Sequence, residues 1–406
     1  MRRNQSFDSD REPFRDDDNL ELQKSRVSGP FSALRPTEAR YHINAAPDGL
    51  ESQSKPPSNV AFKWRSRDNR KGRHTLVVQP SDPSSQYQAP QSTSSLGRIF
   101  HTIGKMFLYY PVWDISWWVA YIFTWGSIIW VINAFFSLLP YTTPSTNFPN
   151  EVLYGGGITA FIGATVFEIG SVLLMLEAIN ENRASCFGWA VESLFEAPST
   201  EKTSTKTSLT LRPAKDKCLH HHANRQNFVG KPQASAVEKS SSASAGGRSW
   251  SWWPSTHDLS THYFHDIGFI ACFSQLLGAT IFWIAGFTAL PGINNNLSSA
   301  ALNGAYWFPQ VLGGCGFVVS GFLFMLETQK KWYLPAFGVL GWHIGLWNFI
   351  GGVGFTLCPC FGFDTAHWAQ YQAATSTFWG SWAFLIGSAV QLYESLEKNP
   401  VEVEKS

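Results

Sequence analysis

One acidic residue of this chain, Glu168, lies deep inside a long apolar run, where an ionisable side chain is costly to place. His343 lies inside another apolar run, at a similar predicted depth. A carboxyl group and an imidazole at this depth are groups that a small-solute or proton-coupled transporter or channel would use. The alternative is that Glu168 is neutral and hydrogen-bonded between helices, because buried acids often neutralise. The amide side chains that would line a path with them are Asn133, Gln275, Gln310 and Asn348.

Three further acids, Glu177, Glu327 and Glu394, stand near the ends of three apolar runs. A carboxylate at the C-terminus of a helix opposes the helix dipole, so each needs a partner. Lys331 and Lys398 follow Glu327 and Glu394 by four residues, the spacing of a helical ion pair, whereas Glu177 lacks such a lysine. Two interpretations stay open. The glutamates are interfacial structure, or they form a cytoplasmic ring of carboxylates that binds cations or a partner.

The other motifs that could bind a metal or carry out catalysis are short and lack the required spacing. The histidines at 220–222 lack paired metal-ligand spacing, and Cys358 and Cys360 lack the spacing of redox or zinc motifs. The sequence contains no phosphate loop, dinucleotide motif or serine, histidine and acid set in a catalytic context. We therefore predict a non-enzymatic protein with no cofactor and no metal, and a formal net charge of +1 gives no reason to expect nucleic acid. A membrane enzyme would have to use the few acidic and histidine residues of the predicted exoplasmic loops, which are Glu151, Asp364 and His367.

Six long apolar runs must position these residues. About 20 residues of helix cross a hydrocarbon core of about 30 Å, so each run is long enough to span a membrane. The sequence therefore predicts an all-α membrane protein with six transmembrane helices in a lipid bilayer. The runs lie near residues 115–139, 152–176, 267–290, 303–326, 335–357 and 374–393.

The basic residues predict the orientation of these helices. Lysine and arginine are absent from 106–182, 249–329 and 332–397, and each gap holds one helix pair with its connection. By the positive-inside rule, both termini and the basic segments between the gaps are cytoplasmic. Asn296 begins a glycosylation sequon in a predicted exoplasmic connection. Plasma membrane and endomembrane are not distinguished.

A spaced pattern recurs in the second, fourth and sixth runs. It consists of Gly, Phe four residues on, a Gly/Ser pair at seven and eight, and Glu at fourteen. Offsets of 4, 7 and 14 keep one helical face, and small residues on such a face allow close helix packing. The copies are Gly163, Phe167, Gly170, Ser171 and Glu177; Gly313, Phe317, Ser320, Gly321 and Glu327; and Gly380, Phe384, Gly387, Ser388 and Glu394.

The first helix of each pair carries a weaker shared pattern. A small pair is followed by an aromatic residue, and Asp114 and Asp266 precede two of these helices as expected N-caps. The unit is a whole hairpin, and the three hairpins share one orientation, so we predict three parallel repeats. The small pairs and aromatics are Gly126-Ser127 with Trp130, Gly278-Ala279 with Phe282, and Gly351-Gly352 with Phe355.

A small-pair helix followed by a helix reading G-x3-F-x2-GS resembles the YrhK-like domain, a two-helix membrane module. The motif is carried by Gly163 to Ser171 and by Gly380 to Ser388, whereas the second copy reverses the pair to Ser320-Gly321. Three copies in one chain look like the uncharacterised multi-pass integral membrane proteins of fungi. The resemblance covers roughly 115–394 and implies a fold but no established activity.

The polar segments complete the predicted domain organisation. Low apolar content predicts that residues 1 to about 95 and 197–249 lack a fixed fold, and 184–195 is an expected amphipathic surface helix. We predict a packing, interaction or sensing module that contacts cytoplasmic proteins through these arms, with transport through Glu168 and His343 as the alternative. The predicted segments are the arm 1–100, hairpin 101–182, loop 183–256, hairpin 257–331, hairpin 332–398 and cytoplasmic tail 399–406.

Overall fold

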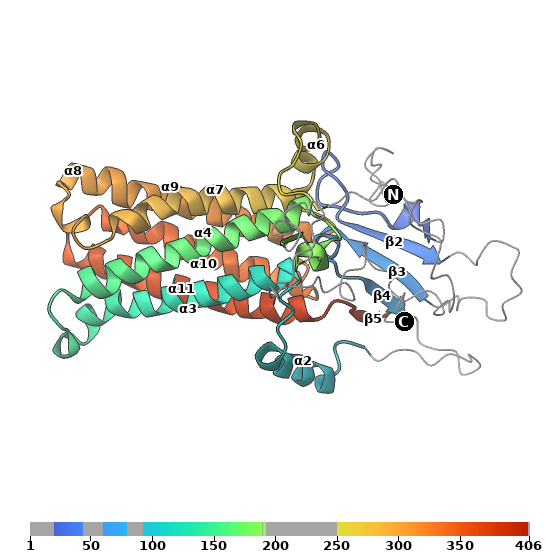
Figure 1. Ribbon diagram of the computed structural model, residues 1–406, viewed down its shortest axis with the longest axis horizontal. Coiled ribbons are helices and arrows are strands. Elements are labelled where there is room, and N and C mark those ends of the chain that lie inside the picture. Colours follow the sequence, from blue (N-terminus) through green and yellow to red (C-terminus); the bar gives the residue numbers. More distant parts are fainter. Residues whose placement is uncertain (1–19, 44–59, 79–91, 189, 192–249, 405–406) are drawn as a thin grey trace, which may run out of the picture.

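The computed structural model describes residues 20–43, 60–78, 92–188, 190–191 and 250–404. Within these ranges the chain forms a long helical bundle with a small β-sheet against one end (Figure 1). We call this the sheet end of the bundle, and the opposite end the loop end. The predicted lack of a fixed fold for 1–19, 44–59, 79–91 and 197–249 lies outside the described residues, as do the histidines at 220–222 and the end of the predicted helix at 192–195.

Six long helices form the bundle. They contact one another in chain order, and the last returns to the first, so they close a ring around a central axis. Five helical segments of the described chain are long and apolar enough to cross a membrane, which indicates a multi-pass membrane protein. The sixth long helix, α11, is more polar and is not among those five. The helices are α3 (Ile115–Thr142), α4 (Gly157–Ile179), α7 (Ile267–Thr288), α9 (Phe308–Glu327), α10 (Leu340–Gly362) and α11 (His367–Leu396).

Aspartates cap two of the helices at the sheet end, as the sequence predicted. The carboxylate of Asp114 accepts a hydrogen bond from the backbone N–H of Ser116 (2.8 Å), and that of Asp266 accepts one from Phe269 N–H (2.9 Å). These bonds satisfy backbone donors that a helix start leaves free. At the loop end, α4 and α9 are each preceded by a π-helical turn, which widens the helix locally. The turns are η4 (Val152–Gly156) and η8 (Asn303–Trp307), the latter following α8 (Ser299–Leu302).

Short helical turns connect the long helices. The connections at the loop end include η3 (Pro144–Thr146) and η7 (Asn294–Asn296), and those at the sheet end include η5 (Ala184–Cys186), α6 (Thr256–Thr261) and η6 (Tyr263–His265). Ala184 and Cys186 are buried, so this part of the predicted surface helix 184–195 packs inside the protein instead. The prediction of a surface helix is wrong there.

Six aromatic rings fill the axis of the bundle, and we call them the aromatic plug. They are the aromatic positions of the spaced patterns, and each is 5% exposed or less. Neighbouring rings lie edge-on or tilted, with centroids 4.9 Å apart for Trp130 and Phe355 and 5.9 Å apart for Phe317 and Phe384. Such geometry is favourable for aromatic pairs. The plug consists of Trp130, Phe167, Phe282, Phe317, Phe355 and Phe384.

The pattern glycines lie at close helix contacts, as predicted. A Cβ added at Gly163 would stand 2.9 Å from the Trp130 ring, and one at Gly380 would stand 3.1 Å from Phe355. At Gly313 it would stand 2.6 Å from Phe282 Cβ. Each glycine therefore leaves room for an aromatic side chain of the plug, which a larger residue would displace.

Replacing Gly313 by alanine is expected to destabilise the bundle by about 1–3 kcal/mol, because overpacking forces side chains and helices apart. The added methyl group would also stand 2.7 Å from Gly278 O, a backbone atom that can yield only if α7 moves. Gly304→Ala is the matched control, since nothing lies within 4 Å of its added Cβ. Thermal unfolding of the purified protein in one detergent measures both. Equal melting temperatures for the two variants would contradict the packing interpretation.

The N-terminal arm and the C-terminal tail share one five-stranded sheet. The strand order is β1-β2-β3-β4-β5, antiparallel up to β4, whereas β5 adds to β4 in parallel. The side chains of Ala39, Tyr41, Phe62 and Trp64 form a small core on it. The strands are β1 (Leu20–Leu22), β2 (Glu38–Ile43), β3 (Val60–Arg65), β4 (Thr75–Val78) and β5 (Val401–Val403), with the turn η2 (Lys24–Arg26) after β1 and the helix α1 (Ser66–Arg70) between β3 and β4.

This sheet overturns the prediction that the whole arm up to about residue 95 lacks a fixed fold. Residues 20–43 and 60–78 are ordered in strands and turns despite their polar composition. The physical reason is that their partners are distant in sequence. The backbone of Leu76 bonds to Pro400 O and that of His74 to Lys398 O, and the bundle end covers the rest. Low local hydrophobicity therefore did not prevent folding.

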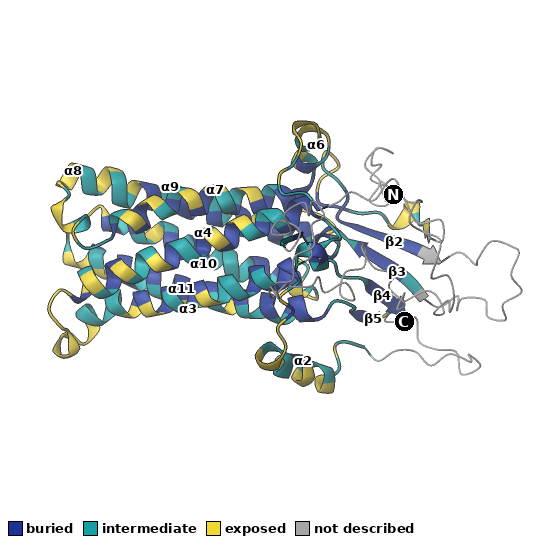
Figure 2. Ribbon diagram, in the orientation of Figure 1, coloured by how far each residue is buried: buried dark blue, intermediate teal, exposed yellow. Residues whose placement is uncertain are grey.

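Burial follows this architecture. Figure 2 shows buried residues concentrated in the strands and where the helices meet the sheet, while the outer faces of the helices carry exposed residues. Several outward residues are large and apolar, such as Ile132, Ile169 and Val319, as expected of a lipid-facing surface. Beside the bundle, α2 (Leu96–Leu108) exposes Leu96, Phe100, Ile103, Phe107 and Leu108 along its length.

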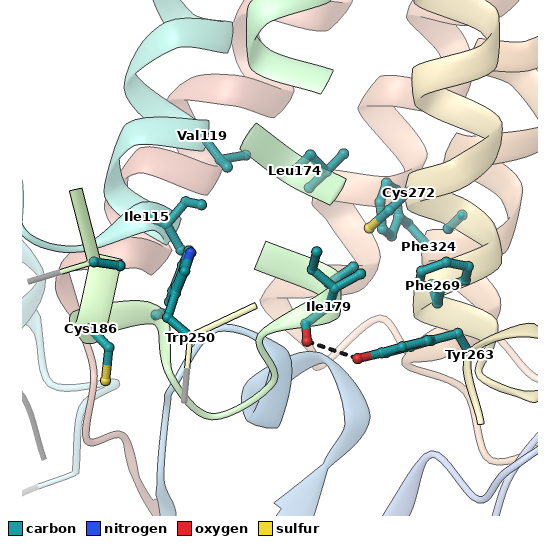
Figure 3. Packing of buried hydrophobic residues seen from close by; sticks show 14 residues of the cluster. Ile115, Val119, Leu174, Ile179, Cys186, Trp250, Tyr263, Phe269, Cys272 and Phe324 are labelled. Carbon is teal, nitrogen blue, oxygen red and sulfur yellow. Dashed lines mark hydrogen bonds between the residues drawn. The ribbon is translucent and has the colours of Figure 1, made fainter. Parts of the chain in front are cut away.

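A hydrophobic cluster joins the helix ends to their connections at the sheet end. Figure 3 shows Ile115 and Val119 of α3, Leu174 and Ile179 of α4, and Phe269 and Cys272 of α7 around this junction. The Tyr263 hydroxyl donates a hydrogen bond to Ile179 O (2.9 Å), which ties the segment before α7 to the end of α4. The junction is therefore well packed, and it supports the charged groups that lie next to it.

Candidate functional site

The short helix α1 brings cations to the end of the bundle. It connects β3 to β4, and its residues contact the ends of the bundle helices. Within six residues the segment contributes Arg67, Arg70 and Lys71, whose side chains are 4% exposed or less. Buried charges need partners, because their loss of hydration is otherwise uncompensated. The partners are the three glutamates of the spaced pattern.

Arg70 bridges the first and second of these glutamates. Its Nη1 lies 2.7 Å from Glu177 Oε1, and its Nη2 lies 2.9 Å from Glu327 Oε2. The guanidinium also stands over the Phe324 ring, 5.2 Å from the centroid. The planar fork of arginine suits such a bridge, since its donors point in fixed directions.

Arg67 and Lys71 complete the circuit. Arg67 donates two hydrogen bonds to Glu394, from Nε to Oε1 (3.0 Å) and from Nη2 to Oε2 (2.7 Å), and its Nη1 lies 4.0 Å from Glu327 Oε2. Lys71 Nζ lies 3.9 Å from Glu394 Oε2 and 3.7 Å from Glu177 Oε2. Three carboxylates and three cations therefore alternate around a closed loop, which we call the ionic ring.

Lys71 is the weakest link of the ionic ring. Its Nζ has no hydrogen-bond partner among the described residues, although two carboxylates lie within ion-pair distance. Burial lowers the pKa of Lys71 to about 8, and Glu177 and Glu394 counter this only in part. The backbone carbonyl of Lys71 accepts a hydrogen bond from Lys398 Nζ (2.8 Å), which is not part of the ionic ring.

An outer layer of polar contacts fixes α1 in place. Arg73 Nη1 lies 2.7 Å from Asp68 Oδ1 and 3.1 Å from Glu394 Oε1. The Ser66 hydroxyl lies within hydrogen-bond distance of both Glu327 Oε1 (3.2 Å) and Asp266 Oδ2 (3.3 Å). Burial, with Glu181 and Glu327 near, raises the pKa of Asp266 to about 6. The ring therefore lies inside a wider network of buried charges.

The ionic ring gives the three glutamates partners other than the lysines that the spacing predicted. The helical pairs with Lys331 and Lys398 are not the contacts that form, because Lys398 Nζ lies 2.6 Å from Asp114 Oδ2 and Lys331 Nζ stands over the Tyr333 ring. The carboxylates instead bind cations, and these cations belong to the same chain. The sequence contained a usable signal, since six basic residues stand between positions 63 and 73, opposite three regularly spaced acids.

Below the ionic ring lies a small cavity on the bundle axis, which we call the inner cavity. All six long helices contribute to its lining, together with Arg67 and Arg70. Its volume of about 30 Å³ is enough for about one or two water molecules. Gln275 and Asn348, two of the amides predicted to line a path, are among the lining residues. Phe167 and Phe384 of the aromatic plug close its other side.

A larger cavity, the vestibule, lies on the same axis toward the loop end. All six long helices again contribute, and the volume is about 500 Å³. Trp130, Phe282 and Phe355 of the aromatic plug line it. The other two predicted amides, Asn133 and Gln310, are also lining residues. The plug therefore stands between two cavities on one axis.

Glu168 and His343 belong to neither cavity and do not meet. They lie on α4 and α10, which are on opposite sides of the ring of helices. Glu168 Oε1 accepts a hydrogen bond from the Thr280 hydroxyl of α7 (2.9 Å), whereas His343 Nε2 lies 2.8 Å from Phe337 O. The predicted pairing with His343 is wrong. A hydroxyl on the neighbouring helix is the partner that Glu168 has.

Replacing Glu168 by glutamine is expected to change the stability by about 1 kcal/mol or less, because the amide oxygen still accepts from Thr280 and such interhelical bonds are weak. Glu168→Leu, which removes the acceptor, should cost slightly more. Thr280→Val is the matched control, since it removes the donor at nearly constant shape. Thermal unfolding of the full chain in one detergent measures the effects. A complete loss of folding in Glu168→Gln would show that the acid itself is required.

The other candidate residues are spread over the loop end. Cys358 is half-buried beside the vestibule and Cys360 is exposed, and both carry free thiols. Asn296 ends η7, is exposed, and donates a hydrogen bond to Gly292 O (2.8 Å). Asp364 and His367 are exposed, whereas Glu151 is buried and lines the vestibule. Within the described ranges no group of three histidine, cysteine or acidic residues is arranged to hold a metal ion.

Comparisons with known proteins add no further information about this site. No protein-family model, curated protein or solved structure matches the chain. The resemblance to the YrhK-like domain therefore stays a prediction.

Proposed function

We propose that this protein crosses the membrane six times as three parallel hairpins of the YrhK-like kind and holds its terminal sheet at the cytoplasmic face, as a non-enzymatic interaction or sensing module. The ionic ring carries this proposal. Each proposed hairpin contributes one glutamate to the ring, and the arm contributes all three cations. The position of the sheet is therefore coupled to all three hairpins at once.

The sixth crossing is supported by the two faces of α11. Its polar residues Ser376, Ser381 and Ser388 are buried toward the other helices, whereas Trp382 and Ile386 are exposed on the outside. The composition of α11 is thus polar where it meets protein and apolar where lipid would lie. Because the polar residues are buried against protein, the mean hydropathy of the whole helix underestimates how apolar its outer face is.

The basic residues support the cytoplasmic location of the sheet. Arg65, Arg67, Arg70, Lys71 and Arg73 all lie at the sheet end, and the segments that build the loop end contain no lysine or arginine. The positive-inside rule then favours a cytoplasmic sheet end. In this position the sheet offers its surface to cytoplasmic proteins, and a signal that breaks the ionic ring would release it.

Accessibility in sealed vesicles tests the topology. Single cysteines are introduced at Asn296 of the loop end and at Arg40 of β2 in a variant that lacks the native cysteines, and an impermeant maleimide labels them before and after lysis. We expect Arg40→Cys to react only in vesicles with the cytoplasmic side outward, and Asn296→Cys only in the opposite orientation. Labelling of both positions from one side would refute the arrangement.

A second candidate function, passage of a small solute along the axis, is favoured by the two aligned cavities. The vestibule and the inner cavity share the axis, and four predicted amides line them. The aromatic plug and the ionic ring would then act as successive closures. Solute flux into liposomes that contain the full-length protein tests this candidate. If the protein passes a solute, Phe167→Ala should open the aromatic plug and raise the flux. Unchanged flux in that variant would eliminate this candidate function.

A further inference from the structure

The vestibule has an unusual combination of side chains that the proposed function does not use. Its lining includes the aromatic residues Trp130, Tyr141, Phe282, Tyr306, Trp307 and Phe355. Its volume of about 500 Å³ lies in the range of small-molecule sites, and it is on the axis of the bundle instead of in a surface groove. A cavity of this kind that is rich in aromatic residues binds ligands through ring faces and apolar contact.

One carboxylate lines this aromatic cavity. Glu151 is 6% exposed, and its Oε2 accepts a hydrogen bond from Phe148 N–H (3.3 Å). In the described part of the chain no cation lies within ion-pair distance of Glu151, and no lysine, arginine or histidine lines the vestibule. A buried carboxylate without a cationic partner is costly, so a bound cation would stabilise it.

The polar groups of the vestibule limit which cation fits. Asn133 uses its Nδ2 to donate to Gly156 O (2.6 Å) and Thr159 Oγ1 (3.0 Å), and Gln310 donates to Tyr306 O (3.1 Å). The N–H donors of these amides are occupied in holding the helices and the π-helical turn η8. A metal ion or a primary ammonium prefers several charged or strongly polar oxygen ligands, whereas a quaternary ammonium group needs aromatic faces and one counter-charge, and the lining holds many aromatic rings and one carboxylate.

We propose that the vestibule binds a small organic cation with a quaternary ammonium group, held by the carboxylate of Glu151 and by the surrounding aromatic rings. Cation–π attraction acts on the methylated nitrogen, and the buried carboxylate of Glu151 supplies the counter-charge. The site is independent of the ionic ring, because the aromatic plug separates the vestibule from the sheet end.

Binding of choline to the full-length protein in lipid nanodiscs tests the proposal. Calorimetry compares choline with dimethylbutanol, its uncharged isostere, and with potassium chloride. We expect choline to bind and dimethylbutanol to bind at least about tenfold more weakly, because it lacks the charge. Equal affinities, displacement of choline by potassium at equal concentration, or no binding of choline at millimolar concentration would each overturn the proposal.

Two variants locate the site. Glu151→Gln keeps the acceptor for Phe148 N–H but removes the charge, and it should weaken choline binding by about tenfold or more. Tyr306→Leu removes an aromatic face and should also weaken it. Asp364→Asn is the control, since Asp364 is an exposed acid of the loop end outside the vestibule lining. Loss of binding in Asp364→Asn but not in Glu151→Gln would place the cation elsewhere and refute the assignment.

Discussion

Replacing Arg70 by methionine is expected to release the sheet from the bundle. The change keeps a side chain that packs on Phe324 but leaves Glu177 and Glu327 as buried carboxylates without their bridge. Removing one partner of a buried ion pair costs about 3–5 kcal/mol, because the remaining charge stays desolvated. Here one guanidinium serves two carboxylates, so the upper part of that range is expected.

Amide hydrogen exchange measures this release directly. The backbone N–H of Asn182 donates to Asn69 O (2.7 Å) and that of His74 donates to Lys398 O (2.8 Å), so both amides exchange when the arm detaches. We expect their exchange to accelerate by about 100-fold or more in Arg70→Met, since about 1.4 kcal/mol corresponds to a factor of ten. Arg40→Met is the control. Its ion pair with Glu404 is partly exposed, and its loss should cost about 1 kcal/mol or less.

A rescue variant separates charge from packing. Glu177→Gln with Glu327→Gln in the Arg70→Met background removes the orphaned charges, so a large part of the protection of Asn182 and His74 should return. If Arg70→Met leaves both amides as protected as in the unaltered protein, the ionic ring does not hold the sheet. If the triple variant is as unprotected as Arg70→Met, the loss arises from packing.

The sequence predicted the bundle well because its signals are local. Apolar runs long enough for a membrane correspond to helices, and Asp114 and Asp266 occupy the capping positions expected of them. The spacing of Gly163, Gly313 and Gly380 predicted close contacts, because a glycine repeated on one helix face has few other uses there. Each of these inferences needs only residues within a few helical turns.

The arm could not be predicted in the same way. Its short strands carry apolar residues such as Phe62, Trp64 and Leu76, but the composition of the whole arm is polar and therefore indicated a chain that does not fold. The missing information was the partner surface: β5 comes from the end of the chain, and the glutamates that receive Arg67 and Arg70 lie more than 100 residues away. The best indication of this contact in the sequence is the match between the basic run at 63–73 and the three regularly spaced glutamates.

Depth in the membrane was also an incomplete guide to function. The sequence places Glu168 deep in a helix, yet the residue lies between α4 and α7 and bonds to Thr280. Glu151 stands in a predicted loop, yet it is the buried carboxylate that lines the vestibule. Whether a residue faces the bundle axis or the outside depends on how all six helices pack. The sequence of one helix does not determine this.

Replacing Phe317 by alanine is expected to destabilise the bundle by about 3–5 kcal/mol, the range for removing a large aromatic side chain from a core. Phe317 is 2% exposed, and its ring contacts those of Phe167, Phe282 and Phe384. These neighbours belong to three different helices, so no single side chain can move in to fill the space. The cavity should remain, and a remaining cavity adds to the lost contacts.

A second phenylalanine of α9 provides the control. Phe322 lies five residues on, is 46% exposed, and faces away from the axis, so Phe322→Ala should change the stability by about 1 kcal/mol or less. Reversible unfolding of both variants in the same lipid and detergent mixture gives the difference. Because the two substitutions delete the same atoms from one helix, a difference below about 1 kcal/mol would show that the aromatic plug does not hold the helices together. A large difference would establish the axis of the bundle as its main core.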